Sequence, residues 1–292
     1  MTRSYLSDGG VLVVGTGYVG RRFLEQCRST AVLGLSRTPV ESPQPVAIFD
    51  LDAGGDLPIR LPDYYAVLYT VPPSSAGESD TRLSRLLSKL TPAPRRFVYI
   101  STTGVYGNRD GESVDEETPV NAESGRAKRR VAAEELLRSW GTQQHCDIVI
   151  LRVPGIYGPG RLGVERIRQG LPAIAESDAG PGNRIHVDDL VSCCGAALSS
   201  HAQAGIYNVG DGDHRSSTWF INELARQSGL EPPPTISMAE AEREFSPMRL
   251  SFLQESRRVS TNKMRDVLGV KLLYPNADKG IRASIDEDPS VP

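Results

Sequence analysis

Short apolar runs alternate with longer amphipathic segments through the first half of the chain. The apolar runs have the length and composition of buried strands, and they are Val11–Gly15, Ala31–Ser36, Pro45–Asp50, Tyr65–Thr70, Arg96–Ser101 and Asp147–Val153. The amphipathic segments predict helices at Tyr18–Cys27, at Arg82–Leu90, and from an N-cap at Asn121 to about Trp140. Strands that alternate with helices in this way are typical of repeated βα units, which build a parallel sheet.

The pattern loosens after Pro154. Segments rich in glycine and proline separate short helices and one further strand near Ile206–Val209. In an α/β protein such irregular segments usually lie above the carboxyl edge of the sheet and form the substrate side of a cleft. We therefore predict an α/β fold, a doubly wound parallel sheet of about seven strands with a small C-terminal substrate lobe. The first part is expected at residues 8–154, and the second part, residues 155–285, is expected to interleave the last sheet strands with the lobe.

The composition narrows the possible partners. The chain of 292 residues carries a formal net charge of −3 and an isoelectric point near 5.9, so no general attraction to nucleic acid or to a membrane surface is expected. The cysteines and histidines show no metal-ligand spacing, so no metal is predicted. The first residues lack the apolar core of a signal peptide, and no apolar run approaches the ~18 residues that span a bilayer. We expect a cytoplasmic protein whose partner is a small molecule.

A glycine-rich sequence closes the first strand and opens the first helix. It matches the pattern G-x-G-x-x-G with Gly15, Thr16, Gly17, Tyr18, Val19 and Gly20. The first glycine permits a tight turn, the second lets the backbone approach a pyrophosphate, and the third lets helix and strand pack closely. The pyrophosphate then lies at the positive end of the helix. Between a strand and a helix, this motif predicts that all six residues form a Rossmann-type dinucleotide site.

The end of the second strand bears on the choice of dinucleotide. Proteins that bind NAD(H) place Asp or Glu there for the ribose 2′-hydroxyl, and that carboxylate would repel the 2′-phosphate of NADP(H). Here the strand ends in Ser36 and Arg37 with no acid. Arg37 offers a planar fork to a phosphate and Ser36 adds a hydroxyl, so NADP(H) is predicted over NAD(H). Later strand ends are expected to border the same cofactor through Asp50, Leu51, Thr70, Val71 and Pro72.

Four further segments carry recognisable motifs. They are Ser101–Gly107 (STTGVYG), Arg152–Gly160 (RVPGIYGPG), Ile185–Leu190 (IHVDDL) and Tyr207–Gly210 (YNVG). Together with the glycine motif they resemble the short-chain dehydrogenase/reductase superfamily, in its extended and atypical NAD(P)-dependent epimerase/dehydratase-like branch. The resemblance covers nearly the whole chain. It implies that Pro154 borders the cofactor and, by analogy, that the protein is a homodimer.

In that family a Ser or Thr hydroxyl, a Tyr phenol and a Lys ammonium converge beside the nicotinamide, with the Tyr four residues before the Lys on one helix. The phenol acts as general acid or base while a hydride moves to or from the nicotinamide. The resemblance assigns Thr102 to the hydroxyl position and Lys128 to the lysine, which can also hold the cofactor ribose. Ser124 stands where the tyrosine belongs, and its hydroxyl is a far weaker acid than a phenol. Tyr106 is the nearest other proton donor along the sequence.

The missing tyrosine leaves two functions open. One is an NADP(H)-dependent oxidoreductase or epimerase-like enzyme that acts on a hydroxyl or carbonyl, with a substrate similar to a nucleotide sugar. The other is a non-catalytic NADP(H)-binding redox sensor or regulatory subunit. A sugar-nucleotide 4,6-dehydratase is disfavoured, because Thr103 follows Thr102 where those enzymes have an Asp-Glu pair. The residues expected on the substrate side are Thr103, Tyr157, Arg161, Arg184 and His186.

Overall fold

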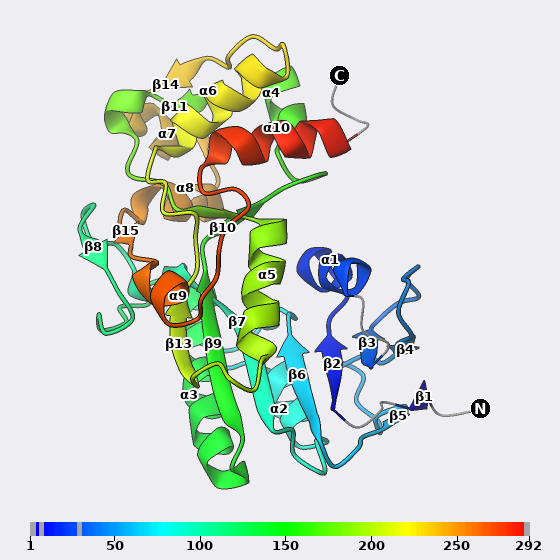
Figure 1. Cartoon of the computed structure of the whole chain (residues 1–292). Helices are drawn as coiled ribbons and strands as arrows, with labels where there is room; N and C mark the ends of the chain where they lie inside the picture. The colour runs from blue at the N-terminus through cyan, green and yellow to red at the C-terminus, as the bar shows by residue number, and fades with distance from the viewer. Residues whose placement is uncertain (1–3, 6–8, 28–30, 289–292) are drawn as a thin grey trace.

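A parallel sheet forms the centre of the computed structural model, which describes residues 4–5, 9–27 and 31–288 (Figure 1). In spatial order its strands are β13 (Gly205–Asn208), β9 (Asp147–Val153), β7 (Arg96–Thr102), β6 (Tyr65–Tyr69), β2 (Gly10–Val14), β3 (Val32–Ser36) and β4 (Val46–Ile48). The chain adds β3 and β4 on one side of β2, then crosses back to add the others on the opposite side. The predicted doubly wound parallel sheet is confirmed.

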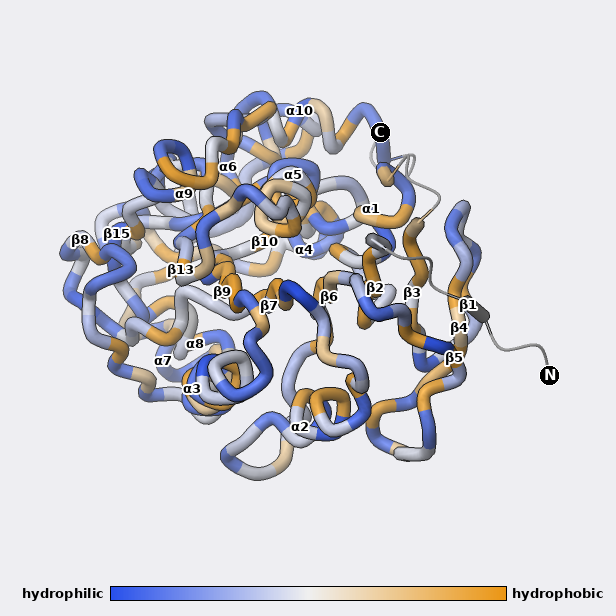
Figure 2. The backbone as a smooth tube through the Cα atoms, turned by 60° about the horizontal axis from the view of Figure 1, so that its bottom comes forward, coloured by the Kyte–Doolittle hydropathy of each residue, from blue (hydrophilic) through white to orange (hydrophobic). Residues whose placement is uncertain are grey.

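Helices cover both faces of this sheet (Figure 2). The helices α1 (Tyr18–Gln26) and α5 (Val187–Leu198) lie side by side on one face, and α2 (Thr81–Leu87) and α3 (Gly125–Gln144) cover the other. Leu12 and Val13 are neighbours in β2, both are fully buried, and they belong to two different apolar clusters. Because both faces of the strand are covered, consecutive positions must be apolar, and this explains why the strands appear as unbroken apolar runs.

A smaller lobe lies beyond the carboxyl ends of the strands, at the top of Figure 1. Its elements are α4 (Val164–Arg168), β11 (Ala173–Ile174), η2 (Glu176–Asp178), α6 (Ser217–Gln227), β14 (Thr235–Ile236), α7 (Met238–Glu244), α8 (Pro247–Gln254) and α10 (Ala277–Glu287). The lobe has an apolar core of its own, to which α4, α6 and α10 contribute. Between these elements the chain returns to the sheet layer as α5 and β13, so the two parts interleave in sequence.

Short strand pairs complete the structure. The pairs are β10 (Gly155–Tyr157) with β12 (Arg184–His186), β8 (Ser113–Val114) with β15 (Arg258–Val259), and β1 (Ser4–Tyr5) with β5 (Ile59–Arg60). The segment η1 (Thr103–Tyr106) directly follows β7, and α9 (Asn262–Asp266) follows β15. Among the helices that the structure describes, none combines the length and the apolar character needed to cross a membrane.

The start of α3 differs from the prediction. The N-cap is Ser124 rather than Asn121, and the Ser124 Oγ accepts a hydrogen bond of 3.3 Å from the Ala127 backbone N–H. The Asn121 backbone N–H instead donates to the Val105 carbonyl, which holds the preceding loop against η1. The helix also continues past Trp140 to Gln144. The expected first residue of the sheet domain, residue 8, lies outside the described residues.

Candidate functional site

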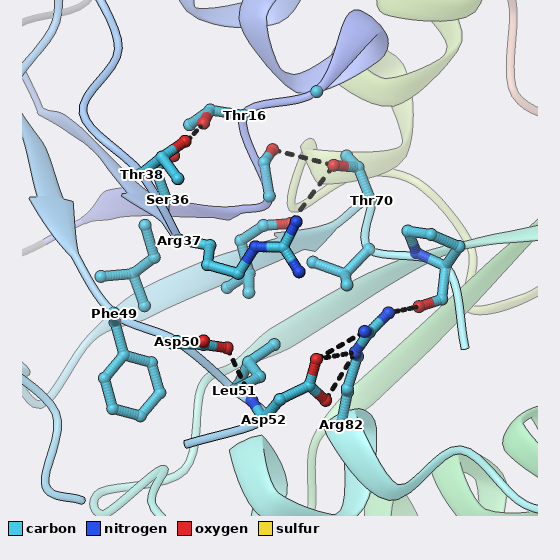
Figure 3. A pocket seen from close by; sticks show the side chains of 16 residues that line it. Thr16, Ser36, Arg37, Thr38, Phe49, Asp50, Leu51, Asp52, Thr70 and Arg82 are labelled. Carbon is cyan, nitrogen blue, oxygen red and sulfur yellow. Dashed lines mark hydrogen bonds and ion pairs between the residues drawn. The ribbon is translucent and has the colours of Figure 1, made fainter. Parts of the chain in front are cut away.

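A pocket of about 350 Å³ opens at the carboxyl edge of the sheet, where β2 and β6 lie next to each other (Figure 3). The chain leaves these two strands in opposite directions, and open α/β sheets bind ligands at such a crossing. We call this space the edge pocket. The residues predicted for the dinucleotide that line it are Gly15, Thr16, Gly17, Ser36, Arg37, Asp50, Leu51, Thr70, Val71 and Pro72.

The glycine motif forms the floor of the edge pocket. A Cβ on Gly20 would stand 1.9 Å from the Gly15 carbonyl oxygen, so only glycine permits this approach between α1 and the loop. A Cβ on Gly17, by contrast, would meet no atom within 4 Å, because this position faces open space. The Thr70 hydroxyl donates a hydrogen bond of 2.9 Å to the Gly15 carbonyl and fixes the loop to β6. The motif therefore leaves a bare backbone surface of the kind that a pyrophosphate requires.

Two arginines and two aspartates line the edge pocket. Arg82 forms an ion pair of 2.5 Å with Asp52, and this hydrogen bond holds the pKa of the Asp52 carboxyl below its usual value. Arg37 is exposed, its side chain extends over the pocket, and no carboxylate among the described residues forms an ion pair with it (Figure 3). The Thr16 hydroxyl donates to the Ser36 Oγ at 2.7 Å, which keeps Ser36 at the same edge. An anion at this edge would therefore meet the Arg37 guanidinium.

A second pocket, of about 500 Å³, continues the edge pocket toward α3. The two share Gly17, Thr70 and Pro72. We call it the α3 pocket. Its lining includes the predicted residues Tyr18, Val19, Thr102, Pro154 and Arg161, together with Arg126, Arg129 and Arg130 of α3, and it includes no carboxylate.

A third pocket, of about 520 Å³, lies between η1 and the small lobe. It shares Thr102, Arg126, Pro154, Ile156 and Arg161 with the α3 pocket, and the predicted residue Thr103 also lines it. We call it the lobe pocket. Because each pocket shares residues with the next, the three form one continuous groove from Arg37 to the lobe. Its length and its bare glycine floor suit an extended dinucleotide followed by a second ligand.

Comparison with known proteins agrees with this geometry. Residues 76–210 match the sequence profile of the NAD dependent epimerase/dehydratase family. Over this segment, 135 of the 292 residues, the chain is similar to that family. The resemblance to the extended branch of the short-chain dehydrogenase/reductase superfamily is confirmed. Two curated relatives are protein YeeZ of Escherichia coli K12, 30% identical over 190 residues, and the 3-diazoavenalumate denitrifying reductase of a Streptomyces species, 29% identical over 196 residues. These matches cover 63% and 64% of this chain, and 64% of the length of each relative.

Solved structures extend the similarity over almost the whole chain. A conserved protein of unknown function from Silicibacter pomeroyi is 28% identical with a TM-score of 0.78, covering 96% of this chain and 99% of that one. The UDP-glucuronic acid 4-epimerase of Bacillus cereus, solved with NAD, has a TM-score of 0.73 at 17% identity and covers 94% and 97%. Human SDR39U1, solved with NADPH, has a TM-score of 0.69 at 18% identity and covers 93% and 98%. The last two share the fold of this chain.

The family's hydroxyl position, Thr102, lies where the α3 and lobe pockets meet. Thr102 ends β7, and its Oγ1 accepts a hydrogen bond of 3.1 Å from the Gly104 backbone N–H at the start of η1. Thr102 is paired with Val153 of β9, which holds the end of β7 from that side, while the pairing with β6 stops at Tyr99. Thr102 is thus available from the groove at a rigid position.

Tyr106 does not occupy the groove, and its assignment as a proton donor is wrong. Its side chain is fully buried, and its hydroxyl donates to the Asn208 Oδ1 at 2.7 Å and accepts from the Arg152 Nη1 at 2.9 Å. Burial raises the pKa of this phenol. Arg152 is also paired with Glu134 at 2.7 Å, and both side chains are buried. The tyrosine of the motif therefore belongs to a buried polar network behind β7, away from any substrate.

The positions Ser124 and Lys128 are also placed differently from what the family pattern suggests. Ser124 caps α3, so its hydroxyl is used by the Ala127 N–H, and Lys128 is exposed and lines none of the three pockets. The residues of α3 that reach the groove include Arg126 and Arg130, which are themselves four positions apart and share one helix face. The side of α3 that lines the groove thus presents arginines.

Three residues predicted for the substrate side are structural. The Tyr157 ring is buried against His186 and Phe220 in the lobe core. His186 caps α5 by accepting from the Asp188 N–H, its Nε2 lies 3.0 Å from the Ser284 Oγ, and burial lowers its pKa to about 4. Arg184 is buried, donates to the Arg215 and Ser216 carbonyls, and does not reach the lobe pocket. Each was assigned from its motif, but in each case the motif fixes a contact inside the lobe.

The sequence reasoning missed several residues of the groove. Arg126 and Arg130 were visible only as part of a basic stretch, although their spacing of four carried a signal. Glu255 and Arg257 line the lobe pocket from the end of α8 and the start of β15, and they form an ion pair of 3.0 Å. No local pattern marks these two positions. Across the described part of the chain, no group of three or more His, Cys, Asp or Glu side chains is placed to hold a metal ion.

Proposed function

We propose that this protein is an NADP(H)-dependent oxidoreductase or epimerase-like enzyme that acts on a hydroxyl or carbonyl group. The observation that carries the proposal is the continuous groove, which begins at the unpaired Arg37, crosses the bare glycine floor and passes Thr102 before it enters the lobe pocket. A dinucleotide in the first two pockets would leave the lobe pocket for the substrate. The family match supports a nicotinamide cofactor.

The preference for NADP(H) rests on the end of β3. Structural relatives solved with NAD and with NADPH share this fold, so the fold alone does not choose between the two cofactors. At the end of β3 this chain offers Ser36 and Arg37 and no acid, and Asp52 is already neutralised by Arg82. A 2′-phosphate at the end of β3 would meet the Arg37 guanidinium, and Arg binds phosphate in a planar, bidentate manner.

Few side chains are placed to take part in the proposed reaction. When bound, the nicotinamide ring would supply or accept a hydride. Thr102 stands at the junction with the lobe pocket, where its hydroxyl can donate a hydrogen bond to a substrate oxygen. Arg126 lines the same junction, and its cationic group would stabilise negative charge that develops on that oxygen. Val153 and Pro154 provide the apolar wall on the other side.

Arg37→Met is expected to weaken NADP+ binding roughly tenfold or more, because a charge-assisted contact to the phosphate is lost. NAD+ has no 2′-phosphate, so its affinity should stay within about twofold of the wild-type value. Calorimetric titration of both dinucleotides into the wild-type and variant proteins measures the two effects. Arg60→Met, on the exposed strand β5, is the matched control. Equal loss of both affinities, or loss of neither, would contradict the proposed role of Arg37.

A second candidate function is a non-catalytic NADP(H)-binding module. It is favoured by one observation: the Ser124 hydroxyl is used as a helix cap, and the exposed Lys128 lines none of the three pockets. Neither residue can therefore supply the proton transfer that the family performs with its tyrosine and lysine. Under this alternative the protein would bind NADPH and respond to its oxidation state without turning it over.

The double variant Arg126→Tyr/Arg130→Lys separates the two candidates, because it places a phenol and an ammonium on the helix face that lines the groove. For an active enzyme that relies on its arginines, we expect turnover by the wild type on a carbonyl panel with NADPH, and loss of roughly tenfold or more in the variant. Turnover that appears only in the variant would favour the non-catalytic module. Ser124→Tyr is the control, since that position caps α3 and should give no gain.

A further inference from the structure

The groove carries more positive charge than a dinucleotide accounts for. The α3 pocket is lined by Arg126, Arg129, Arg130 and Arg161 and by no Asp or Glu. The glycine loop and the start of α1 already offer backbone N–H groups to a pyrophosphate. The 2′-phosphate of NADP(H) would lie at Arg37 in the edge pocket, away from these four arginines. We therefore asked which of the four are turned toward the substrate.

Two of the four arginines are held by neutral groups of the sheet layer. Arg130 donates from Nη1 to the Tyr99 hydroxyl at 2.9 Å and to the Ile100 carbonyl at 2.7 Å. Arg129 donates to the Gly77 carbonyl at 3.1 Å. Both line the α3 pocket but not the lobe pocket. They are therefore positioned for the cofactor rather than for the substrate.

Arg126 lines both pockets and belongs to a chain of ion pairs. Its Nη2 lies 3.5 Å from the Glu255 Oε1, while the Arg257 Nη2 lies 3.0 Å from the Glu255 Oε2. One carboxylate is thus shared by two guanidinium groups, and Arg257, the closer partner, is also the more buried of the two. The Arg126 side chain is 32% exposed and lines both pockets, so its guanidinium is accessible from the groove.

Arg161 faces the same junction from the loop after β10. It lines the α3 and lobe pockets, and its guanidinium lies 5.2 Å from the centre of the Tyr18 ring. No carboxylate in the described residues forms an ion pair with it. Asp178, the other acid of the lobe pocket, accepts hydrogen bonds from Ser177 and from the Met238 N–H at the start of α7. The two carboxylates of the lobe pocket thus have partners other than Arg161.

We propose that Arg126 and Arg161 together bind an anionic group of the substrate, a carboxylate or a phosphate, at the junction beside Thr102. The inference rests on the proposed function, because it places the reacting oxygen at Thr102 and the anion next to it. Two guanidinium groups can hold a carboxylate or phosphate by charge-assisted hydrogen bonds, which fix orientation as well as add affinity. The substrate class is thus an anionic carbonyl or hydroxyl compound, with the anion close to the reacting carbon.

The test is calorimetry on the full chain saturated with NADP+. The probes are oxamate for a carboxylate, inorganic phosphate for a phosphate, and acetamide as the uncharged analogue of oxamate. We expect one of the two anions to bind with a stoichiometry of one while acetamide does not. Arg126→Met and Arg161→Met should each weaken that anion roughly tenfold or more. Arg226→Met, an exposed arginine of α6 outside the groove, should leave its affinity unchanged.

The outcomes separate this inference from the function on which it rests. If NADP+ binds but neither anion does, or if both arginine variants bind the anion as the wild type does, the anionic subsite is refuted and the cofactor proposal stands. If the two variants weaken NADP+ itself to the same extent, the arginines serve the pyrophosphate and the inference is again refuted. Failure of the wild type to bind NADP+ would refute the proposed function and this inference together. Comparison of the oxamate and phosphate arms identifies which anion the site prefers.

Discussion

Arg152→Met is expected to destabilise the protein by about 3–5 kcal/mol, because it leaves the Glu134 carboxylate buried without its cationic partner. The Arg152 and Glu134 side chains are only 4% and 5% exposed, and their closest atoms are 2.7 Å apart. Methionine has a similar length and adds no donor for the carboxylate. Urea unfolding of the wild-type and variant proteins measures the difference, and a loss below about 1 kcal/mol would contradict the expected burial penalty.

The double variant Arg152→Met/Glu134→Met is the control for this prediction. Removing both charges eliminates the buried carboxylate, so the double variant should be more stable than Arg152→Met alone. The Ser101 hydroxyl, which donates to Glu134 at 2.5 Å, would lose its acceptor in the double variant, and full recovery is therefore not expected. A double variant that is less stable than the single one would mean that packing, rather than charge, dominates the effect.

This buried network has a consequence for the groove. Ser101 and Arg152 are paired positions of β7 and β9, and Thr102 is the next residue of β7. The network also holds Tyr106 at the end of η1, the segment that Thr102 caps. The positions of Thr102 and of η1 are therefore supported by this buried polar network, whose member Ser101 also lines the α3 pocket. A hydroxyl that must meet a substrate oxygen benefits from such rigid support.

The sheet could be predicted from the sequence because its strands are buried on both faces. Consecutive apolar positions such as Leu12 and Val13 fit strands that are covered on both faces, and every predicted strand of the central sheet is present. The edge pocket was equally accessible, since the glycine loop is contiguous in sequence and Arg37 follows directly from β3. Local sequence determines both features, so both can be predicted without knowledge of tertiary contacts.

The substrate side could not be predicted, because segments far apart in the sequence build it. Glu255 and Arg257 reach Arg126 from a segment more than a hundred residues away, and only the tertiary fold brings them together. The family pattern also named the wrong residue on α3. Each helical residue turns the side-chain direction by ~100°, so an assignment shifted by two positions names Lys128, whereas Arg126 lines the groove. His186, Arg184 and Tyr157 have polar groups that suit a binding site, but the lobe buries them.

Gly20→Ala and Gly17→Ala are both expected to weaken NADP+ binding, but only Gly20→Ala is expected to cost much stability. The Cβ of Gly20→Ala would stand 1.9 Å from the Gly15 carbonyl oxygen, so α1 must move away from the loop. Forcing an extra methyl group into a closely packed site costs about 1–3 kcal/mol. The displaced helix also carries the N–H groups that face the pyrophosphate, so NADP+ binding should fall with stability.

Gly17→Ala should separate binding from folding. Gly17 has φ of −72°, which alanine adopts freely, and the added Cβ would meet no protein atom within 4 Å. The loss of a glycine N-cap should cost at most about 1 kcal/mol. The same Cβ projects into the space where a pyrophosphate would rest, and we expect NADP+ affinity to fall roughly tenfold or more through this steric conflict. Urea midpoints and calorimetric titration with NADP+ give both quantities. If Gly17→Ala binds NADP+ as well as the wild type does, the pyrophosphate cannot lie against this loop, because the one open face of the glycine motif would then be unused.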